Sequence, residues 1–146
     1  SSPSRGLGDV YKRQDMTRSF ATKGFSDEQK SIYDVVLNAQ VKSIEGIKPG
    51  MSCKSIDSIA RDHIEKAGYS KFFDHGLGHS LGLEIHEDPR FSKVSEDFLE
   101  ENYVMTVEPG IYVPDIGGVR IEDDIIVTKN GAEILNKTPK EFQVIT

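Results

Sequence analysis

Residues 98–113 read "FLEENYVMTVEPGIYV" and residues 117–135 read "GGVRIEDDIIVTKNGAEIL", and these two stretches decide the fold. Both are rich in the β-branched and aromatic residues that favour strands. In the first stretch, Pro109-Gly110 predicts a break within the strand. In the second, Asn130-Gly131 predicts a hairpin turn between one strand and its antiparallel return. The second half of the chain is therefore expected to be a largely antiparallel sheet.

Two helices are predicted upstream of these strands. Ser26 and Gln29 form a capping-box pattern at the start of the first helix, and Gly46 ends it. The second helix is expected to begin after Ser52 and to end at Gly68. Their apolar stripes are Ile32, Val35, Val36 and Ala39, then Ile56, Ile59, Ala60, Ile64 and Ala67. Two helices followed by an antiparallel sheet make an α+β fold.

The first fourteen residues, "SSPSRGLGDVYKRQ", have neither a helical nor a strand period. They resemble a translated sequencing adaptor, and we interpret residues 1–14 as such an artefact, with a disordered native tail as the alternative. Residues 15–146 are then the part of the chain that belongs to one folded domain.

Composition excludes several classes of protein. The chain has 146 residues and a net charge of −6, so a nucleic acid or a membrane surface is not an expected partner. Its single cysteine, Cys53, excludes an internal disulfide and is typical of a reducing compartment. No apolar run approaches the roughly 20 residues that span a bilayer. A cytoplasmic location is the resulting expectation.

Three histidines lie close together in "HGLGHSLGLEIHE", residues 75–87, at His75, His79 and His86. The glycine spacing misses the dinucleotide-binding fingerprint, and no preceding strand and following helix are predicted around it. A helical H-x-x-x-H zinc site is also disfavoured, because the glycines at 76, 78 and 82 each weaken a helix by up to about 1 kcal/mol. The histidines therefore need not share one face or one role. His63, by contrast, is expected to be a packed or half-exposed helix residue.

The carboxylates within the predicted strands suggest a metal. Glu108 lies in an apolar strand, and strand alternation places Arg120, Glu122 and Asp124 on one face, opposite a core-like face that includes Asp123. Buried carboxylates require a cation or hydrogen-bond donors. Carboxylates combined with one imidazole suit Mn, Co or Zn. The alternatives are that Glu108 merely ends a strand and that Glu122 merely pairs with Arg120.

The segments "HGLGHSLGLEIHE", "VEPGIY", "GGVRIEDDIIVT" and "DMTRSF" together resemble the pita-bread metallopeptidases, in particular their Xaa-Pro aminopeptidase and Xaa-Pro dipeptidase branch. This resemblance implies a partial pita-bread fold and two divalent metals per intact site, Mn above all, with Co or Zn as alternatives. The implied metal ligands are Asp15, His79, Glu108 and Glu122. The implied catalytic residues are His86 and Glu108, and the implied substrate-binding residues are His75, His86 and Arg120.

One feature of the family is missing. Its first aspartate lies eleven residues before the second, which would fall on Ser4. The resemblance therefore implies the C-terminal part of a catalytic domain, without the first aspartate ligand. We expect such a chain to hold at most one metal well and to have impaired activity.

The implied reaction is metal-dependent hydrolysis of the bond between an N-terminal residue and proline, as an Xaa-Pro aminopeptidase performs it, on a peptide with proline at its second position. The alternatives are an Xaa-Pro dipeptidase, a non-catalytic pita-bread binding module or inactive fragment, and a metal-independent creatinase-type hydrolase. Glu108 and Glu122 count against the last of these. A homodimer is compatible with the resemblance.

Overall fold

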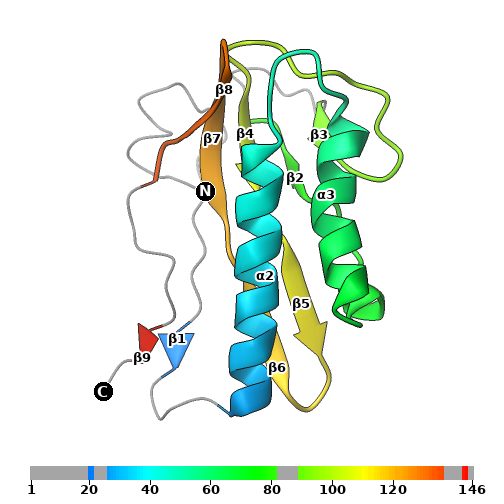
Figure 1. Cartoon of the computed structure of the whole chain (residues 1–146), viewed down its shortest axis with the longest axis vertical. Coiled ribbons are helices and arrows are strands. Elements are labelled where there is room, and N and C mark those ends of the chain that lie inside the picture. Colours follow the sequence, from blue (N-terminus) through cyan, green and yellow to red (C-terminus); the bar gives the residue numbers. More distant parts are fainter. Residues whose placement is uncertain (1–19, 22–25, 82–88, 137–142, 145–146) are drawn as a thin grey trace.

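The computed structural model describes residues 20–21, 26–81, 89–136 and 143–144. Two helices lie side by side and cover the strands of the second half of the chain (Figure 1). The helices are α2 (Asp27–Glu45) and α3 (Cys53–Lys66), followed by a short 3-10 helix, η1 (Ser70–Phe72). The strands are β1 (Phe20–Ala21), β2 (Gly78–His79), β3 (Arg90–Phe91), β4 (Val104–Val107), β5 (Gly110–Val113), β6 (Gly117–Arg120), β7 (Asp123–Thr128), β8 (Gly131–Ile134) and β9 (Gln143–Val144).

Both helices begin where the sequence predicts. At the start of α2, Ser26 Oγ accepts a hydrogen bond from the amide of Gln29, whose side chain accepts one from the Ser26 amide in return. Ser52 caps α3 in the simpler form, by accepting from the Ser55 amide. Ala67, predicted in the apolar stripe of α3, is instead the exposed C-cap of that helix, because the chain leaves the helix before this residue can face the core.

The strands pair mostly antiparallel. β4, β7 and β8 form a three-stranded sheet in the order β4-β7-β8, β5 pairs with β6, and β2 pairs with β3. The short β1–β9 pair is parallel. α2 packs against β4, β5, β6 and β8, and α3 against β3. The two helices and the antiparallel strands confirm the predicted α+β class.

The hydrophobic core lies between the helices and the strands. From the helix side, α2 contributes Ile32, Tyr33, Val36 and Ala39, and α3 contributes Cys53, Ile56, Ala60 and Ile64. From the strand side, the core includes Met105, Val107, Ile111, Val119, Ile121, Ile125 and Val127. Burial of these apolar side chains is the main stabilising contribution to such a fold. No described helix is long and apolar enough to cross a membrane.

Three local expectations for residues 117–135 are wrong. The predicted single strand is divided, since β6 ends at Arg120 and β7 begins at Asp123. The hairpin turn lies one residue earlier than predicted, because Gly131 already pairs with Thr128 in the ladder. Asp124 is fully buried rather than on a polar face, because both faces of β7 are covered at this end. At this buried end of β7, the Asp124 amide donates to Asn136 Oδ1.

Candidate active site

Glu108 and Glu122 lie opposite each other at the gap between the β4–β7 pair and the β5–β6 pair. Val107 pairs with Asp123 on one side of the interruption, and Gly110 pairs with Arg120 on the other. These two pairs share one continuous antiparallel register. The residue after Val107, Glu108, is therefore opposite the residue before Asp123, Glu122. The amide of Ile121 still donates to the Pro109 carbonyl at 3.3 Å, which keeps the two strands together. Because Pro109 has no N–H, it cannot return a hydrogen bond to Ile121, and the regular ladder is interrupted beside both acids.

His79 reaches Glu108 from a neighbouring strand. β2 is held beside β4 because the His79 amide donates to Thr106 Oγ1 at 3.0 Å and the Glu108 amide donates to the Leu77 carbonyl at 2.7 Å. Gly78 is required at this contact, since a β-carbon there would overlap the carbonyl oxygen of Thr106. As a result, His79 Nε2 lies 3.5 Å from Glu108 Oε2.

The His79 ring is held in one tautomer. Its Nδ1 lies 3.1 Å from the Ser80 carbonyl oxygen, and a carbonyl can only accept, so we assign the proton to Nδ1. Nε2 then presents a lone pair toward Glu108. Glu108 Oε2 is buried and makes no hydrogen bond with any described residue. A buried acceptor without a hydrogen bond destabilises the fold unless a cation or another donor satisfies it.

The distance between the two acceptors fits a shared metal ion better than a shared proton. A charge-assisted N–H···O bond would draw the atoms to about 2.8 Å. Adjacent ligands of one ion, with bonds of about 2.0–2.2 Å, stand about 3.0–3.5 Å apart. The observed 3.5 Å between His79 Nε2 and Glu108 Oε2 agrees with the second case. These two residues therefore fit the role of metal ligands.

The remaining predicted ligands are not brought into one cluster by the described residues. Asp15 lies outside the described residues, and so does the predicted catalytic residue His86. Glu122 is nearly fully buried opposite Glu108. Within the described ranges, no group of three His, Cys, Asp or Glu side chains is close enough to hold a metal ion. The four-ligand set therefore stays a prediction, of which the structure brings together His79 and Glu108.

A cleft of about 490 Å³ opens beside this pair. Four residues predicted from the sequence line it, namely His75, His79, Glu108 and Arg120. The cleft thus unites predicted substrate-binding residues with predicted metal ligands, although the first and the last of them are 45 positions apart in the sequence. It is lined by side chains from β2, β3, β5 and β6 and from the loop before β2.

His75 lines the cleft, and its ring contacts two aromatic side chains. Its Nδ1 lies 2.7 Å from the Gly76 carbonyl oxygen, so Nδ1 carries the proton. Its Nε2 is buried without a hydrogen bond to any described residue. The ring lies edge-on to Phe73, with centroids 4.9 Å apart, and tilted against Tyr112 at 6.2 Å. Gly110 leaves room for it, because a β-carbon there would lie 3.2 Å from His75 Nε2.

Sequence reasoning missed three polar residues of the cleft, Arg90, Ser92 and Tyr112. Tyr112 lies within the "VEPGIY" segment and is 44% exposed. It follows a buried strand residue, so strand alternation alone could have placed it at the surface. Arg90 had no comparable signal, since its place in the cleft depends on the antiparallel pairing of His79 with Arg90 across β2 and β3.

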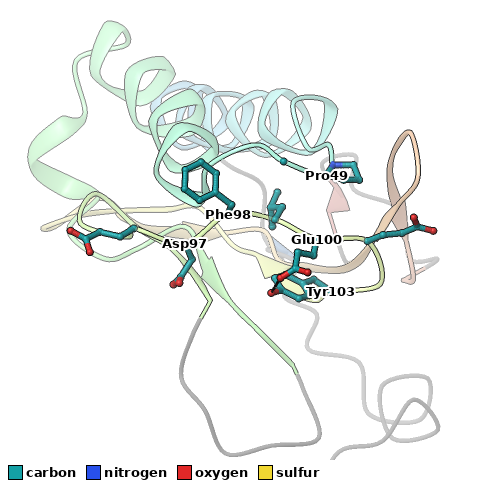
Figure 2. Close-up of a pocket in the computed structure, with 9 residues that line it drawn as sticks. Pro49, Asp97, Phe98, Glu100 and Tyr103 are labelled. Atoms are coloured by element: carbon teal, nitrogen blue, oxygen red, sulfur yellow. Dashed lines mark hydrogen bonds between the residues drawn. The ribbon is translucent and has the colours of Figure 1, made fainter.

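A second hollow, of about 710 Å³, lies away from the histidines, between the α2–α3 connection and the segment before β4 (Figure 2). Pro49 and Phe98 line it together with the acidic residues Asp97 and Glu100. Tyr103 Oη donates a 2.6 Å hydrogen bond to Glu100 Oε2, and this bond, with smaller effects from burial and nearby acidic groups, raises the pKa of Tyr103 to about 12. None of the predicted site residues lines this hollow.

The chain belongs to metallopeptidase family M24, whose sequence model matches residues 10–129. It is 50% identical over 138 residues to an Xaa-Pro dipeptidase of Pyrococcus horikoshii, a match that covers 93% of this chain and 39% of the relative. The chain thus spans about two-fifths of the length of such curated relatives.

Solved structures agree with this family. An Xaa-Pro dipeptidase from Bacillus anthracis superposes with a TM-score of 0.86 at 48% identity, over 89% of this chain and 37% of that one. An X-Pro aminopeptidase from Thermotoga maritima superposes with a TM-score of 0.84 at 42% identity, over 89% of this chain and 36% of that one. The fold and family predicted from the four motifs are confirmed.

Proposed function

We propose that this chain supplies the cleft of a metal-dependent peptidase that hydrolyses the bond between an N-terminal residue and proline. The observation that carries the proposal is the His79–Glu108 pair, in which two acceptors face each other at 3.5 Å in a cleft that His75 and Arg120 also line. The family and the names of the relatives support the same class of reaction.

His79 and Glu108 would hold the ion, with Glu122 and Asp15 as the further predicted ligands. A bound divalent ion supplies a water of lowered pKa and polarises the carbonyl under attack. Mn is the proposed ion, because the predicted set is rich in carboxylates, although Co and Zn suit the same ligands.

The chain's own residues then handle the proton and the substrate. Glu108 lines the cleft and would accept a proton from a water there and pass it on. His75 and Arg120 line the same cleft and would contact the substrate. His86, outside the described residues, remains the predicted contact for the developing oxyanion.

A dipeptide substrate is the second form of this proposal. Arg90 and Arg120 both line the cleft, and guanidinium groups recognise carboxylates with good geometry. The free carboxylate of a dipeptide would meet these cations directly, whereas a longer peptide carries that charge farther away. The relatives named as Xaa-Pro dipeptidases favour the same form. Comparing Ala-Pro with Ala-Pro-Ala as substrates separates dipeptidase from aminopeptidase activity.

The experiment that tests the proposal measures hydrolysis of Ala-Pro by the natural protein at its full length, with Mn²⁺ and with a chelator. Glu108→Gln should lower kcat by at least about a hundredfold, because a proton-transfer group contributes roughly 10²–10⁴-fold. Glu133→Gln, the same change at an exposed site on β8, is the matched control and should keep full activity. Undiminished turnover in Glu108→Gln, or turnover that survives the chelator, would contradict the proposal. Absence of any hydrolysis by the unmodified protein would favour the binding-module alternative.

A further inference from the structure

An ion pair on α3 is buried beneath the loop that carries His75. Arg61 donates to both carboxylate oxygens of Asp57, from Nε to Oδ2 at 2.8 Å and from Nη2 to Oδ1 at 3.1 Å. The Asp57 side chain is 1% exposed and that of Arg61 is 17% exposed. The pair makes two hydrogen bonds and its carboxylate is buried, so it differs from the solvated i, i+4 pairs that usually contribute little.

The same two side chains bind the backbone on each side of His75. Arg61 Nη1 donates to the Phe73 carbonyl at 3.0 Å, and Arg61 Nη2 donates to the His75 carbonyl at 2.9 Å. Asp57 Oδ1 accepts from the Leu77 amide at 3.1 Å. The pair thus makes one hydrogen bond to each of three alternate residues, with His75 at the centre.

Ring contacts extend this arrangement to the His75 side chain. The Arg61 guanidinium lies 4.3 Å from the centroid of the Phe73 ring, at cation–π distance. The Phe73 ring in turn meets the His75 ring edge-on, with centroids 4.9 Å apart. The guanidinium, the phenyl ring and the imidazole therefore form a continuous series of contacts that ends at the cleft.

We propose that Asp57 and Arg61 are positioning residues that fix the His75 imidazole in the cleft. The effect on catalysis rests on the proposed function, whereas the effect on the loop does not. A pair of apolar residues could fill the same buried volume at similar or greater stability. Such residues could not donate to the carbonyls of Phe73 and His75 or accept from Leu77. The pair is therefore explained by the loop geometry that it imposes.

The test compares Asp57→Asn and Arg61→Lys with Asp62→Asn in this chain by NMR. Asp62 is exposed on the same helix, so Asp62→Asn makes the same chemical change away from the loop. Hydrogen exchange of the Leu77 amide and the ring nitrogen shifts of His75 report on the loop. The Val127 amide, which bonds the Tyr103 carbonyl and makes no bond to the His75 loop, reports on global stability. Arg61→Lys keeps the charge but loses the planar fork, so it is the milder variant if Asp57→Asn folds poorly.

We expect exchange at Leu77 to rise at least about tenfold relative to Val127 in Asp57→Asn and Arg61→Lys, with shifted His75 ring signals. Asp62→Asn should leave both unchanged. In the full-length protein, the same two variants should raise KM for Ala-Pro about tenfold and change kcat less, because His75 is predicted to bind the substrate. Unaltered Leu77 exchange and His75 signals would overturn the proposal. So would a loosened loop with unchanged KM in an active protein, whereas inactivity of the unmodified protein would refute only the proposed function.

Discussion

His79 Nε2 and Glu108 Oε2 face each other at 3.5 Å with no proton assigned between them. Each residue is held by a hydrogen bond from its own amide, which runs from His79 to Thr106 Oγ1 and from Glu108 to the Leu77 carbonyl. The same strand contact thus brings the two acceptors together and requires a glycine at position 78. This contact between β2 and β4 is the structural basis of the candidate metal site.

Gly78→Ala should therefore disturb the site and the fold together. Its added β-carbon would overlap the Thr106 carbonyl, which belongs to the backbone of β4 and cannot turn aside. We expect the free energy of unfolding to fall by about 1–3 kcal/mol, measured by urea denaturation. Gly131→Ala is the matched control, since a β-carbon there would lie 3.6 Å from the Ile47 carbonyl oxygen, in ordinary contact. Equal stability of the two variants would show that β2 can move away from β4 at little cost, and would contradict the requirement for glycine at position 78.

Gln40 joins the two strands next to the paired acids. Its side-chain amide is fully buried and donates to Asp123 Oδ2 at 3.0 Å and to the Val107 carbonyl at 3.3 Å. Gln40→Leu fills a similar volume but removes both donors. We predict a loss of about 1–3 kcal/mol in the free energy of unfolding, compared by urea denaturation with Asn38→Leu at an exposed position of α2. A loss no greater than in Asn38→Leu would contradict the bridging role.

The start of each helix could be predicted from sequence, because capping is a local interaction between residues three apart. Ser26 with Gln29, and Ser52 before α3, are readable without knowledge of the rest of the chain. The division between β6 and β7 could not be read in this way. This division depends on Pro109, which is distant in sequence but lies opposite Ile121. Pro109 has no N–H to donate to the ladder.

The candidate site, too, could be predicted only where local sequence carries the signal. Motif resemblance singled out His75, His79, Glu108 and Arg120, and the cleft brings these four together. Arg61 and Asp57 were not singled out, because an acid and a base four residues apart on a helix usually form a solvated surface pair. Only the packing of the loop 73–77 over α3 shows that this pair is buried and bound to backbone.

Cys53 gives the chain a pH-dependent stability in the alkaline range. Burial, with a smaller effect from Asp97, raises the pKa of its thiol from 9.0 to about 11. The unfolded chain releases this proton above pH 9 while the folded chain retains it, so the free energy of unfolding should fall between pH 9 and pH 11. Urea denaturation across this interval should show a shallower fall for Cys53→Ala. Parallel curves for the two proteins would mean that the buried thiol does not contribute.

Binding of Mn²⁺ to this chain tests the central claim most directly. Isothermal titration should detect at most one well-held ion, and His79→Ala and Glu108→Gln should each weaken its binding by more than about tenfold. His63→Gln is the control, since His63 lies on α3 beside Lys42 and outside the cleft. Loss of binding in the two site variants with retention in the control is the predicted result. Unchanged Mn²⁺ affinity in His79→Ala, or two equally tight sites in the unmodified chain, would contradict the assignment of His79 and Glu108 as the metal-holding pair.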